Sequence, residues 1–370
     1  MNLLDYLTQP SLLNSYQLKK SEFFNSISTF KDIADGQIDL SKIEVALLGV
    51  PFAEDNSYNS TFVDSVRLEL AELASFQHNT SILDAGNLIQ GNTVNDSLTA
   101  LKDVITYLYK HNVFVITISD VYLVQKIFIE SLKKEKNIKV AEVAPKFYIH
   151  EILEYISQSS LEQLHYTNIG YQSYYIRQET FNWLNNNSFD AYRLGEVRNN
   201  LSGIEPAIRD SLIINISLNA LKNTDAPGQK EISPNGFYSE EICQIAKYAG
   251  VADHLRLANL SGFSENTDVI TCKLTAQIIW FIIEGYGNRV TEDPTKDLYI
   301  KKFNVNSSGN DNIIFYKSDK TERWWMEVPL NFTNQSFIIP SDYKDYIEAC
   351  NQQIPERFLK AMQKYNFKAD

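Results

Sequence analysis

The stretch LIINISLNALKNTDAPGQKEISPNGF, residues 212–237, decides the fold of this 370-residue chain. It begins with aliphatic, mostly β-branched residues, and such a run is typical of a strand that is buried on both faces. The run ends in SLNAL, residues 217–221. A loop follows that contains the turn-forming pairs Pro227-Gly228 and Asn235-Gly236. The stretch therefore predicts a buried strand that leads into a long loop.

Outward from this stretch, short β-branched runs alternate with amphipathic helical patterns between residues 42 and 290. Alternation of this kind predicts an α/β fold in three layers, a mostly parallel sheet covered by helices on both faces. Strands are expected at 43–50, 112–118, 138–143, 166–171, 211–218 and 254–260. Helices are expected at 63–74, at 98–110, from Ser239 onward and at 275–286, the last apolar enough to be buried on most sides.

The two ends of the chain differ from this central domain. Residues 1–41 predict one or two short helices packed on the domain. Residues 291–370 predict a small C-terminal extension that packs on the main domain. Within it, 313–329 reads as a hairpin that turns at Ser318-Asp319-Lys320, and two short helices follow, separated at Pro355.

Composition excludes several classes of protein. Apolar residues make up 44% and charged residues 22%, as in an ordinary globular protein. A net charge of −12 argues against a nucleic-acid partner, because phosphate contacts need clustered Lys and Arg. The longest apolar run, 278–283, is too short for membrane insertion. Three scattered cysteines and no evident secretory signal predict a cytoplasmic protein.

Several motifs, in order, resemble those of the ureohydrolases: arginase, agmatinase and, most closely, bacterial formimidoylglutamase-like proteins. They are ALLGVPF (46–52), LDAG (83–86, similar to a family motif that follows its second strand), NIGYQS (168–173), SPNGF (233–237), EEICQIAKYAG (240–250) and TAQIIWFIIEGYGNR (275–289). The resemblance implies an arginase-like fold and a homo-oligomer. It also implies a site in which four aspartates and two histidines hold two Mn²⁺ ions.

The residues at the six metal-ligand positions differ from the family pattern. The resemblance places the first histidine at Asp120, or at Val121 if the loop shifts by one residue. It places the other ligands at Ala144, Lys146, Tyr148, Asn219 and Leu221. A further family acid, which contacts the guanidine-like group of the substrate, aligns with Asn259.

These substitutions predict that the Mn²⁺ pair is lost and that the protein has no cofactor. Carboxylates offset the charge of hard divalent cations, and at most one acid remains among the six positions. Lys146 would place an ammonium group where the family holds a dication. One hypothesis is that Asp120 and Lys146 form an ion pair in place of the metals; the alternative is that each points into solvent.

Other candidate residues favour structural roles. His150 lies beside Glu151 near the former cleft, but neighbours along a helix do not face each other. Cys243 and Cys272 sit at apolar positions, as buried structural cysteines do. Trp324, Trp325 and Met326 have the composition of an interface anchor, although aromatic residues of this kind also pack in cores.

Two functions from different classes follow. The leading hypothesis is a catalytically inactive ureohydrolase homologue, a scaffold that binds an unknown protein partner or a small ligand. The alternative is an active hydrolase of the formimidoylglutamase or arginase type, which cleaves a linear amidine C–N bond at an atypical metal site. The absence of any Asp-x-His-x-Asp or Asp-x-Asp pattern favours the first. A metal-free enzyme of new specificity has no positive support.

Overall fold

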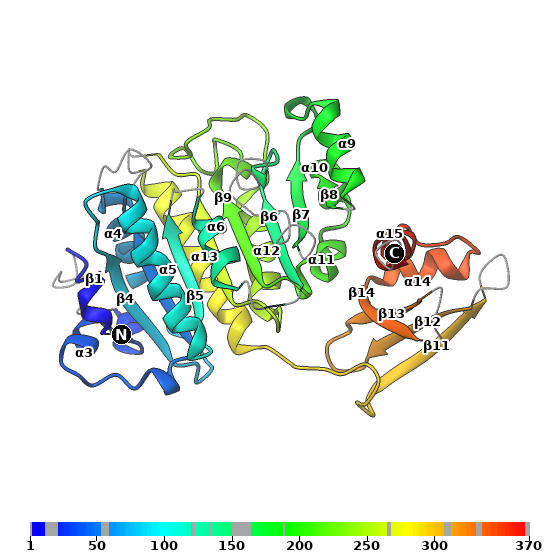
Figure 1. Ribbon diagram of the computed structural model, residues 1–370, viewed down its shortest axis with the longest axis horizontal. Coiled ribbons are helices and arrows are strands. Elements are labelled where there is room, and N and C mark those ends of the chain that lie inside the picture. Colours follow the sequence, from blue (N-terminus) through cyan, green and yellow to red (C-terminus); the bar gives the residue numbers. More distant parts are fainter. Residues whose placement is uncertain are drawn as a thin grey trace.

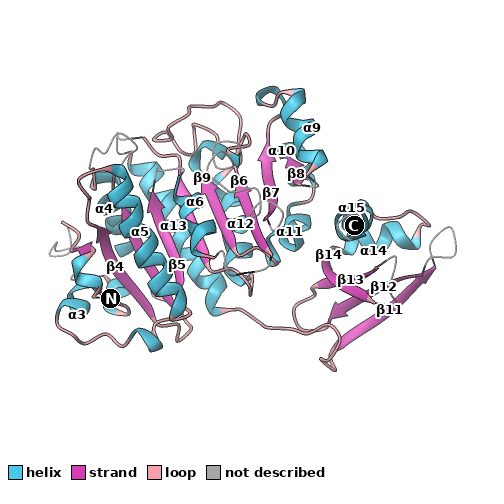
Figure 2. Ribbon diagram, viewed as in Figure 1, coloured by secondary structure: helices cyan, strands magenta, loops and turns pink. Residues whose placement is uncertain are grey.

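The computed structural model contains two sheets, one large and one small (Figures 1 and 2). It describes residues 2–11, 21–52, 59–119, 123–132, 135, 137–149, 164–187, 189–264, 268–306, 312–330 and 335–366. The large sheet and its helices form the main body. The small sheet and the last two helices form a second unit, called the C-terminal unit below, which lies beside the β7–β8 end of the large sheet (Figure 1).

The large sheet has ten strands in the order β1-β4-β3-β5-β10-β9-β6-β7-β8, with β2 also paired to β4. Only β1 runs antiparallel to its neighbour, so the predicted mostly parallel sheet is confirmed. The strands are β1 Leu7–Thr8, β2 Ser28–Thr29, β3 Val45–Val50, β4 Ile82–Leu88, β5 Phe114–Ser119, β6 Ile138–Val143, β7 Leu164–Tyr171, β8 Asp190–Arg193, β9 Ile213–Ser217 and β10 Leu257–Ser261.

Helices cover both faces of this sheet, which confirms the predicted three layers (Figure 2). One apolar core lies between the sheet and α4, α12 and α13, and the other lies between the sheet and α5 and α6. The helices of the main body are α2 Glu22–Asn25, α3 Phe30–Ala34, α4 Thr61–Ala71, α5 Val94–Lys110, α6 Leu123–Ser131, α9 Gln178–Asn186, α10 Leu194–Asn199, α11 Glu205–Arg209, α12 Ser239–Val251 and α13 Val269–Gly287.

The helix α13 is long and apolar enough to cross a membrane by length and composition. More than half of it is nevertheless buried inside the structure, against the sheet, α4 and α12. The backbones of α12 and α13 approach closely at two glycines, since a Cβ on Gly250 would lie 2.3 Å from the carbonyl oxygen of Ile282. These contacts make α13 a core helix of the main body, as its composition predicts.

A buried arginine explains one strand that the sequence patterns did not predict. The motif LDAG lies inside β4, not after a strand as the resemblance implied. The fully buried Arg67 donates to both carboxylate oxygens of Asp84, at 2.8 and 3.0 Å, and to the Asn87 side chain at 2.8 Å. Gly86 has a φ of +87°, and a Cβ there would meet the Thr8 backbone at 2.5 Å. The polar residues of β4 are thus satisfied partners of a buried guanidinium.

The C-terminal unit has its own antiparallel sheet, β11-β12-β13-β14, and its own small core. Its elements are β11 Ile300–Asn306, β12 Asn312–Ser318, β13 Trp324–Pro329, β14 Ser336–Ser341, α14 Tyr343–Cys350 and α15 Glu356–Asn366. The predicted hairpin is confirmed as β12 and β13, and the two predicted short helices are confirmed as α14 and α15, on either side of Pro355.

Ion pairs join this unit to the main body. Glu205 of α11 accepts hydrogen bonds from Arg209 on its own helix and forms a 3.2 Å ion pair with Arg323 of the C-terminal unit. Arg209 also donates to the Trp324 carbonyl (2.9 Å) and lies over the Trp325 ring, and Arg323 donates to the Val251 carbonyl (2.8 Å). All three charged side chains are at least 85% buried, and Arg323 also lies 3.6 Å from the Asp253 carboxylate, so two carboxylates balance the two guanidinium groups.

We therefore expect Glu205→Ala to loosen the C-terminal unit. The substitution leaves two buried guanidinium groups short of a carboxylate, which costs about 3–5 kcal/mol of stability. The measurement is urea unfolding together with limited proteolysis of the 288–299 connection. Lys301→Ala removes an exposed ion pair with Asp319 in the same unit and is the matched control, expected to change stability by less than about 1 kcal/mol. Equal effects of the two substitutions would contradict this role for Glu205.

Candidate functional site

A row of polar side chains crosses the interior of the large sheet. Its members are paired in register on five neighbouring strands, β5-β10-β9-β6-β7: Thr117, Asn259, Asn215, Glu142 and Asn168. Side chains at paired positions of a sheet point to the same face. All five are at least 96% buried, on the face covered by α5 and α6. A polar row in this position requires internal partners, because water does not reach it.

Hydrogen bonds connect one half of the row. The Thr117 hydroxyl donates to the Asn259 side-chain oxygen at 2.6 Å, and the Asn259 amide donates to the Asn215 oxygen at 2.9 Å. Ser261, at the end of β10, also donates to that oxygen at 3.1 Å. Asn259, which aligns with a substrate-contacting acid of the family, is thus 99% buried and hydrogen-bonded to its neighbours on β5 and β9.

The carboxyl group of the row, Glu142, was not predicted as a site residue. It accepts hydrogen bonds from the Tyr166 hydroxyl, from Gln125 Nε2 of α6 at 2.8 Å and from the Tyr148 backbone N–H at 3.4 Å. Burial raises the pKa of Glu142 above its ordinary value, although these hydrogen bonds act in the opposite direction. In the sequence, Glu142 is a single acid inside an otherwise apolar strand pattern. Such a pattern predicts the strand but not the role of the acid.

Three of the positions that the motif resemblance aligns with metal ligands meet at the carboxyl edge of the sheet, beyond the row. The Asn219 side chain donates to the Tyr148 hydroxyl at 3.4 Å and accepts from the Glu231 backbone N–H at 2.9 Å. The Tyr148 hydroxyl donates to the Glu231 carboxylate at 3.3 Å. Lys146 forms a 2.7 Å ion pair with the same carboxylate, and its ammonium lies 5.2 Å from the Tyr148 ring centre. Lys146, Tyr148, Asn219 and Glu231 are called the edge cluster below.

The loop after β9 brings Glu231 to this cluster. It follows the single 3-10 turn Leu218–Ala220 at the end of β9 and returns beside Leu221, which forms an isolated bridge with Phe237. Gly236 is required at the return, since a Cβ there would lie 2.2 Å from the Leu221 backbone. Glu231 lies ten residues beyond Leu221 inside this loop, and no spacing in the sequence pointed to it.

The remaining predicted positions have different surroundings. Ala144 and Leu221 are fully buried and apolar, and Leu221 belongs to the core under α12 and α13. Asp120, Val121, His150 and Glu151 lie outside the described residues. The expected Asp120–Lys146 ion pair therefore stays a hypothesis. In the described part of the chain, Lys146 forms its ion pair with Glu231.

Solved structures with the same arrangement of helices and strands identify the fold. A formiminoglutamase from Trypanosoma cruzi, solved with Mn²⁺, matches with a TM-score of 0.61 at 14% identity, over 68% of this chain and 95% of that chain. The fold is that of the ureohydrolase superfamily. The formimidoylglutamase of Bacillus subtilis matches with a TM-score of 0.59 at 14% identity, over 69% of this chain and 91% of that one.

A third ureohydrolase-fold structure, the proclavaminate amidino hydrolase of Streptomyces clavuligerus, matches with a TM-score of 0.57 at 14% identity. The match covers 73% of this chain and 98% of that chain. No protein-family model matches the sequence, and no curated protein matches it significantly. The likeness to the ureohydrolases is thus one of fold, and the chemistry has to be argued from the residues of this chain.

The edge cluster does not fit a pair of Mn²⁺ ions. Hard dications need several carboxylate ligands to offset their charge. Among the described residues, no three His, Cys, Asp or Glu side chains lie close enough together to hold a metal ion. The carboxylate of the edge cluster is already neutralised by Lys146, whose ammonium repels a cation.

Trp324, Trp325 and Met326, named as an interface anchor from the sequence, are buried within the chain, at 8, 7 and 0% exposure. Trp324 stacks on Tyr346 inside the C-terminal unit, with ring centres 4.9 Å apart. Trp325 lies under Arg209 of the main body. The two tryptophans therefore anchor an interface between the two units of one chain.

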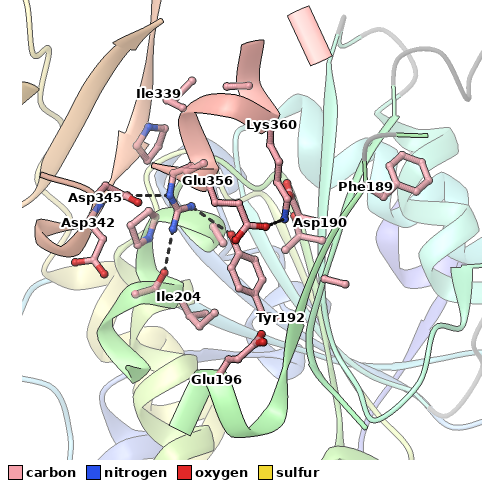
Figure 3. Close-up of a pocket in the computed structure, with 18 of the residues that line it drawn as sticks. Phe189, Asp190, Tyr192, Glu196, Ile204, Ile339, Asp342, Asp345, Glu356 and Lys360 are labelled. Carbon is pink, nitrogen blue, oxygen red and sulfur yellow. Dashed lines mark hydrogen bonds and ion pairs between the residues drawn. The ribbon is translucent and has the colours of Figure 1, made fainter. Parts of the chain in front are cut away.

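A cleft of about 650 Å³ lies on the α15 side of this interface (Figure 3). In it, Arg357 donates to the Asp345 carboxylate at 3.1 Å and to the Tyr192 hydroxyl and the Gly203 carbonyl at 3.3 Å each. Lys360 lies between Asp190 of β8 and Glu356 (Figure 3). The Lys360–Asp190 pair crosses the interface, whereas Arg357–Asp345 and Lys360–Glu356 lie within the C-terminal unit. This cleft is called the α15 cleft below.

We expect Glu142→Gln to change the pH dependence of stability. Because the native pKa is raised, the folded state holds a proton that the unfolded state releases above about 4.5. Parent stability therefore falls as pH rises from that value through the native pKa, by up to about 1.4 kcal/mol per pH unit, and the amide removes this slope.

Urea unfolding of both proteins between pH 5 and 8 measures this difference. The variant should gain on the parent as pH rises, and Gln125 Oε1, which has no hydrogen-bond partner in the described structure, can accept from the new amide. A constant loss of several kcal/mol across this range would mean that Glu142 is ionised in the folded protein.

We also expect the two former ligand positions after β9 to respond differently to a restored acid. Leu221→Asp buries an unpartnered carboxylate in an apolar core and should cost at least about 4 kcal/mol. Asn219→Asp keeps the acceptor for the Glu231 N–H but loses a donor, and should cost about 1–3 kcal/mol. Thermal or urea unfolding of both variants, with and without Mn²⁺, is the measurement. Stabilisation of Leu221→Asp by Mn²⁺ would show that this side chain reaches a metal-binding cleft.

Proposed function

We propose that this chain is a catalytically inactive protein of ureohydrolase fold that serves as a binding scaffold for a protein partner or a small ligand. The edge cluster carries this proposal. Positions that would hold metal in the family are occupied by Lys146, Tyr148 and Asn219, which bond to one another and to Glu231. Ala144 and Leu221 offer no donor atom at all.

The chemistry of amidine hydrolysis supports the same conclusion. Two metal ions in such a site convert a bound water into a hydroxide nucleophile near neutral pH. In the edge cluster, burial raises the pKa of the Tyr148 hydroxyl, so Tyr148 keeps its proton and is not available to accept one from water. Glu231 is held by Lys146 and Tyr148. No side chain of this cluster is poised to activate water.

The competing function is an active hydrolase of linear amidine C–N bonds with an atypical metal site. It is supported by the fold neighbours, which are named formiminoglutamase, formimidoylglutamase and proclavaminate amidino hydrolase. Fold alone is weak support, because one fold hosts many functions and the site decides the chemistry.

Three further features belong to this proposal. We place the protein in the cytoplasm, because Cys243 and Cys272 are free, buried thiols whose pKa burial raises to about 12. Its net charge of −12 supports neither a nucleic-acid partner nor attraction to an anionic membrane. A homo-oligomer is expected by analogy with the ureohydrolases.

Elemental analysis and an amidine assay together test the proposal. Protein expressed with added Mn²⁺ should contain well below one metal per chain and should not be stabilised thermally by Mn²⁺. It should release no product from N-formimidoyl-glutamate, arginine or agmatine. Near two Mn²⁺ per chain with hydrolysis of any of these substrates would overturn the proposal and establish the competing function.

A further inference from the structure

A second cleft, of about 730 Å³, lies where the C-terminal unit meets α11 and α12 of the main body. It shares Pro206 and Asp342 with the α15 cleft. Its walls are built entirely from described residues, which include Arg209, Lys247, Tyr248, Lys317, Trp324 and Tyr343. We call it the tryptophan cleft. Its volume is within the range of small-molecule sites, which often lie between domains.

Aromatic rings form one part of its wall. Tyr343 is 55% exposed, and its ring centre lies 5.6 Å from that of Trp324 and 6.1 Å from that of Tyr346. Tyr248 of α12 contributes a half-buried ring from the main body. The Tyr343 ring is tilted by 47° to that of Trp324, which itself stacks on Tyr346. An exposed tyrosine held against such a pair is a rigid surface on which a flat ring can pack at little conformational cost.

The charges of the tryptophan cleft favour an anion. Four cationic side chains line it, Arg209, Lys247, Lys317 and Arg323, against three acids, Glu205, Glu322 and Asp342, in a chain whose net charge is −12. Glu205 is committed to the two arginines, and Asp342 caps α14 and accepts from Asn200. The third acid, Glu322, is largely exposed and pairs with Lys317, so it is the acid of this cleft that is least engaged by the fold.

The two lysines are the adaptable donors. Lys247 pairs with Glu284 at 3.3 Å and is 41% exposed, while Lys317 pairs with the largely exposed Glu322 at 2.5 Å. Each ammonium has three N–H donors, so a ligand anion can be bound without breaking these pairs. Lys247 comes from the main body and Lys317 from the C-terminal unit, where it lies 5.8 Å from the Trp324 ring centre.

One buried polar atom in this wall also lacks a partner. Ser341 is 1% exposed, and its hydroxyl has no hydrogen bond within the described part of the chain. In the α15 cleft, by contrast, seven acids face five lysine and arginine side chains, and Arg357 and Lys360 are held in the interface. The two clefts therefore differ in the sign of their lining charge.

We propose that the tryptophan cleft binds a planar aromatic anion, a flat ring system that carries one carboxylate or comparable acidic group. The ring packs on Tyr343 beside Trp324, and the acidic group lies between Lys247 and Lys317. This proposal deepens the scaffold function above and rests on its claim that the chain binds a ligand.

Titration calorimetry of the full chain with 2-naphthoate tests the chemistry. Two matched probes separate ring from charge: 2-naphthamide keeps the ring without the charge, and hexanoate keeps the charge without the ring. One site per chain is expected for 2-naphthoate, with binding at least about tenfold weaker for either matched probe. Raising NaCl from 50 to 500 mM should weaken the binding of 2-naphthoate and leave the binding of 2-naphthamide unchanged. Equal binding of the acid and the amide, or no binding of 2-naphthoate at millimolar concentration, overturns the proposal.

Variants test the location. Tyr343→Ala and the double variant Lys247→Met/Lys317→Met should each weaken 2-naphthoate by about tenfold or more. The controls are Tyr175→Ala, another exposed tyrosine, and Lys296→Met/Lys301→Met, two exposed lysines outside the cleft, and none should change affinity. Thermal unfolding checks that each variant is folded, and single lysine variants replace the double one if it is not.

Unchanged affinity in the cleft variants, or equal losses in the controls, would place the probe elsewhere and overturn the site. The outcome is separate from that of the proposed function. Amidine hydrolysis would refute catalytic inactivity without touching this cleft, and failure of 2-naphthoate to bind would refute the ligand class while leaving the metal and amidine results as they stand.

Discussion

The desolvation of polar groups inside the large parallel sheet is the constraint on which this structure depends. Both faces of the sheet are covered, so every polar side chain there must find a partner within the chain. The row from Thr117 to Asn168 meets this requirement mainly with hydroxyl and amide groups, which can donate and accept without net charge. Its single carboxyl group, Glu142, is accommodated by three donors and a raised pKa.

The same constraint explains why the edge cluster is a poor substitute for a metal site. A dication needs several carboxylates around it. Without the metal, these carboxylates would repel one another. This chain instead places one ammonium against one carboxylate, on the loops after β6 and β9, with Tyr148 and Asn219 hydrogen-bonded beside them. Both charges are roughly 40% exposed, so the ion pair contributes at most about 1 kcal/mol and the cluster is stable without a ligand.

Much of the fold was predictable, because hydrophobic periodicity reports burial. The buried strands β3, β5, β6, β7, β9 and β10 and the helices α4, α5, α12 and α13 all have such patterns. β4 was missed as a strand because Asp84, Gly86 and Asn87 look like loop residues, and only their contact with Arg67, 17 to 20 positions away, makes them core residues. β8 is a four-residue edge strand without an apolar run.

The candidate site was predictable only in part, for a related reason. The positions Lys146, Tyr148 and Asn219 followed from motif resemblance, and the structure brings them together. Glu231 did not follow, since the path of the loop after β9 is set by contacts such as the close approach at Gly236, which no periodicity encodes. The partner of Lys146 therefore had to come from the structure.

Buried polar groups at the interface between the two units also need partners within the chain, but here they are charged. Its buried guanidinium groups, Arg209 and Arg323, pair with the carboxylates of Glu205 and Asp253 and donate to backbone carbonyls. They therefore fix the C-terminal unit in place and have little capacity left for a ligand. The lysines at the open margin of the tryptophan cleft are partly solvated and only singly paired. The groups that hold the two units together, Arg209, Arg323 and Glu205, are thus not the groups that meet the ligand, Lys247 and Lys317. A ligand can therefore bind across the two units without weakening their attachment.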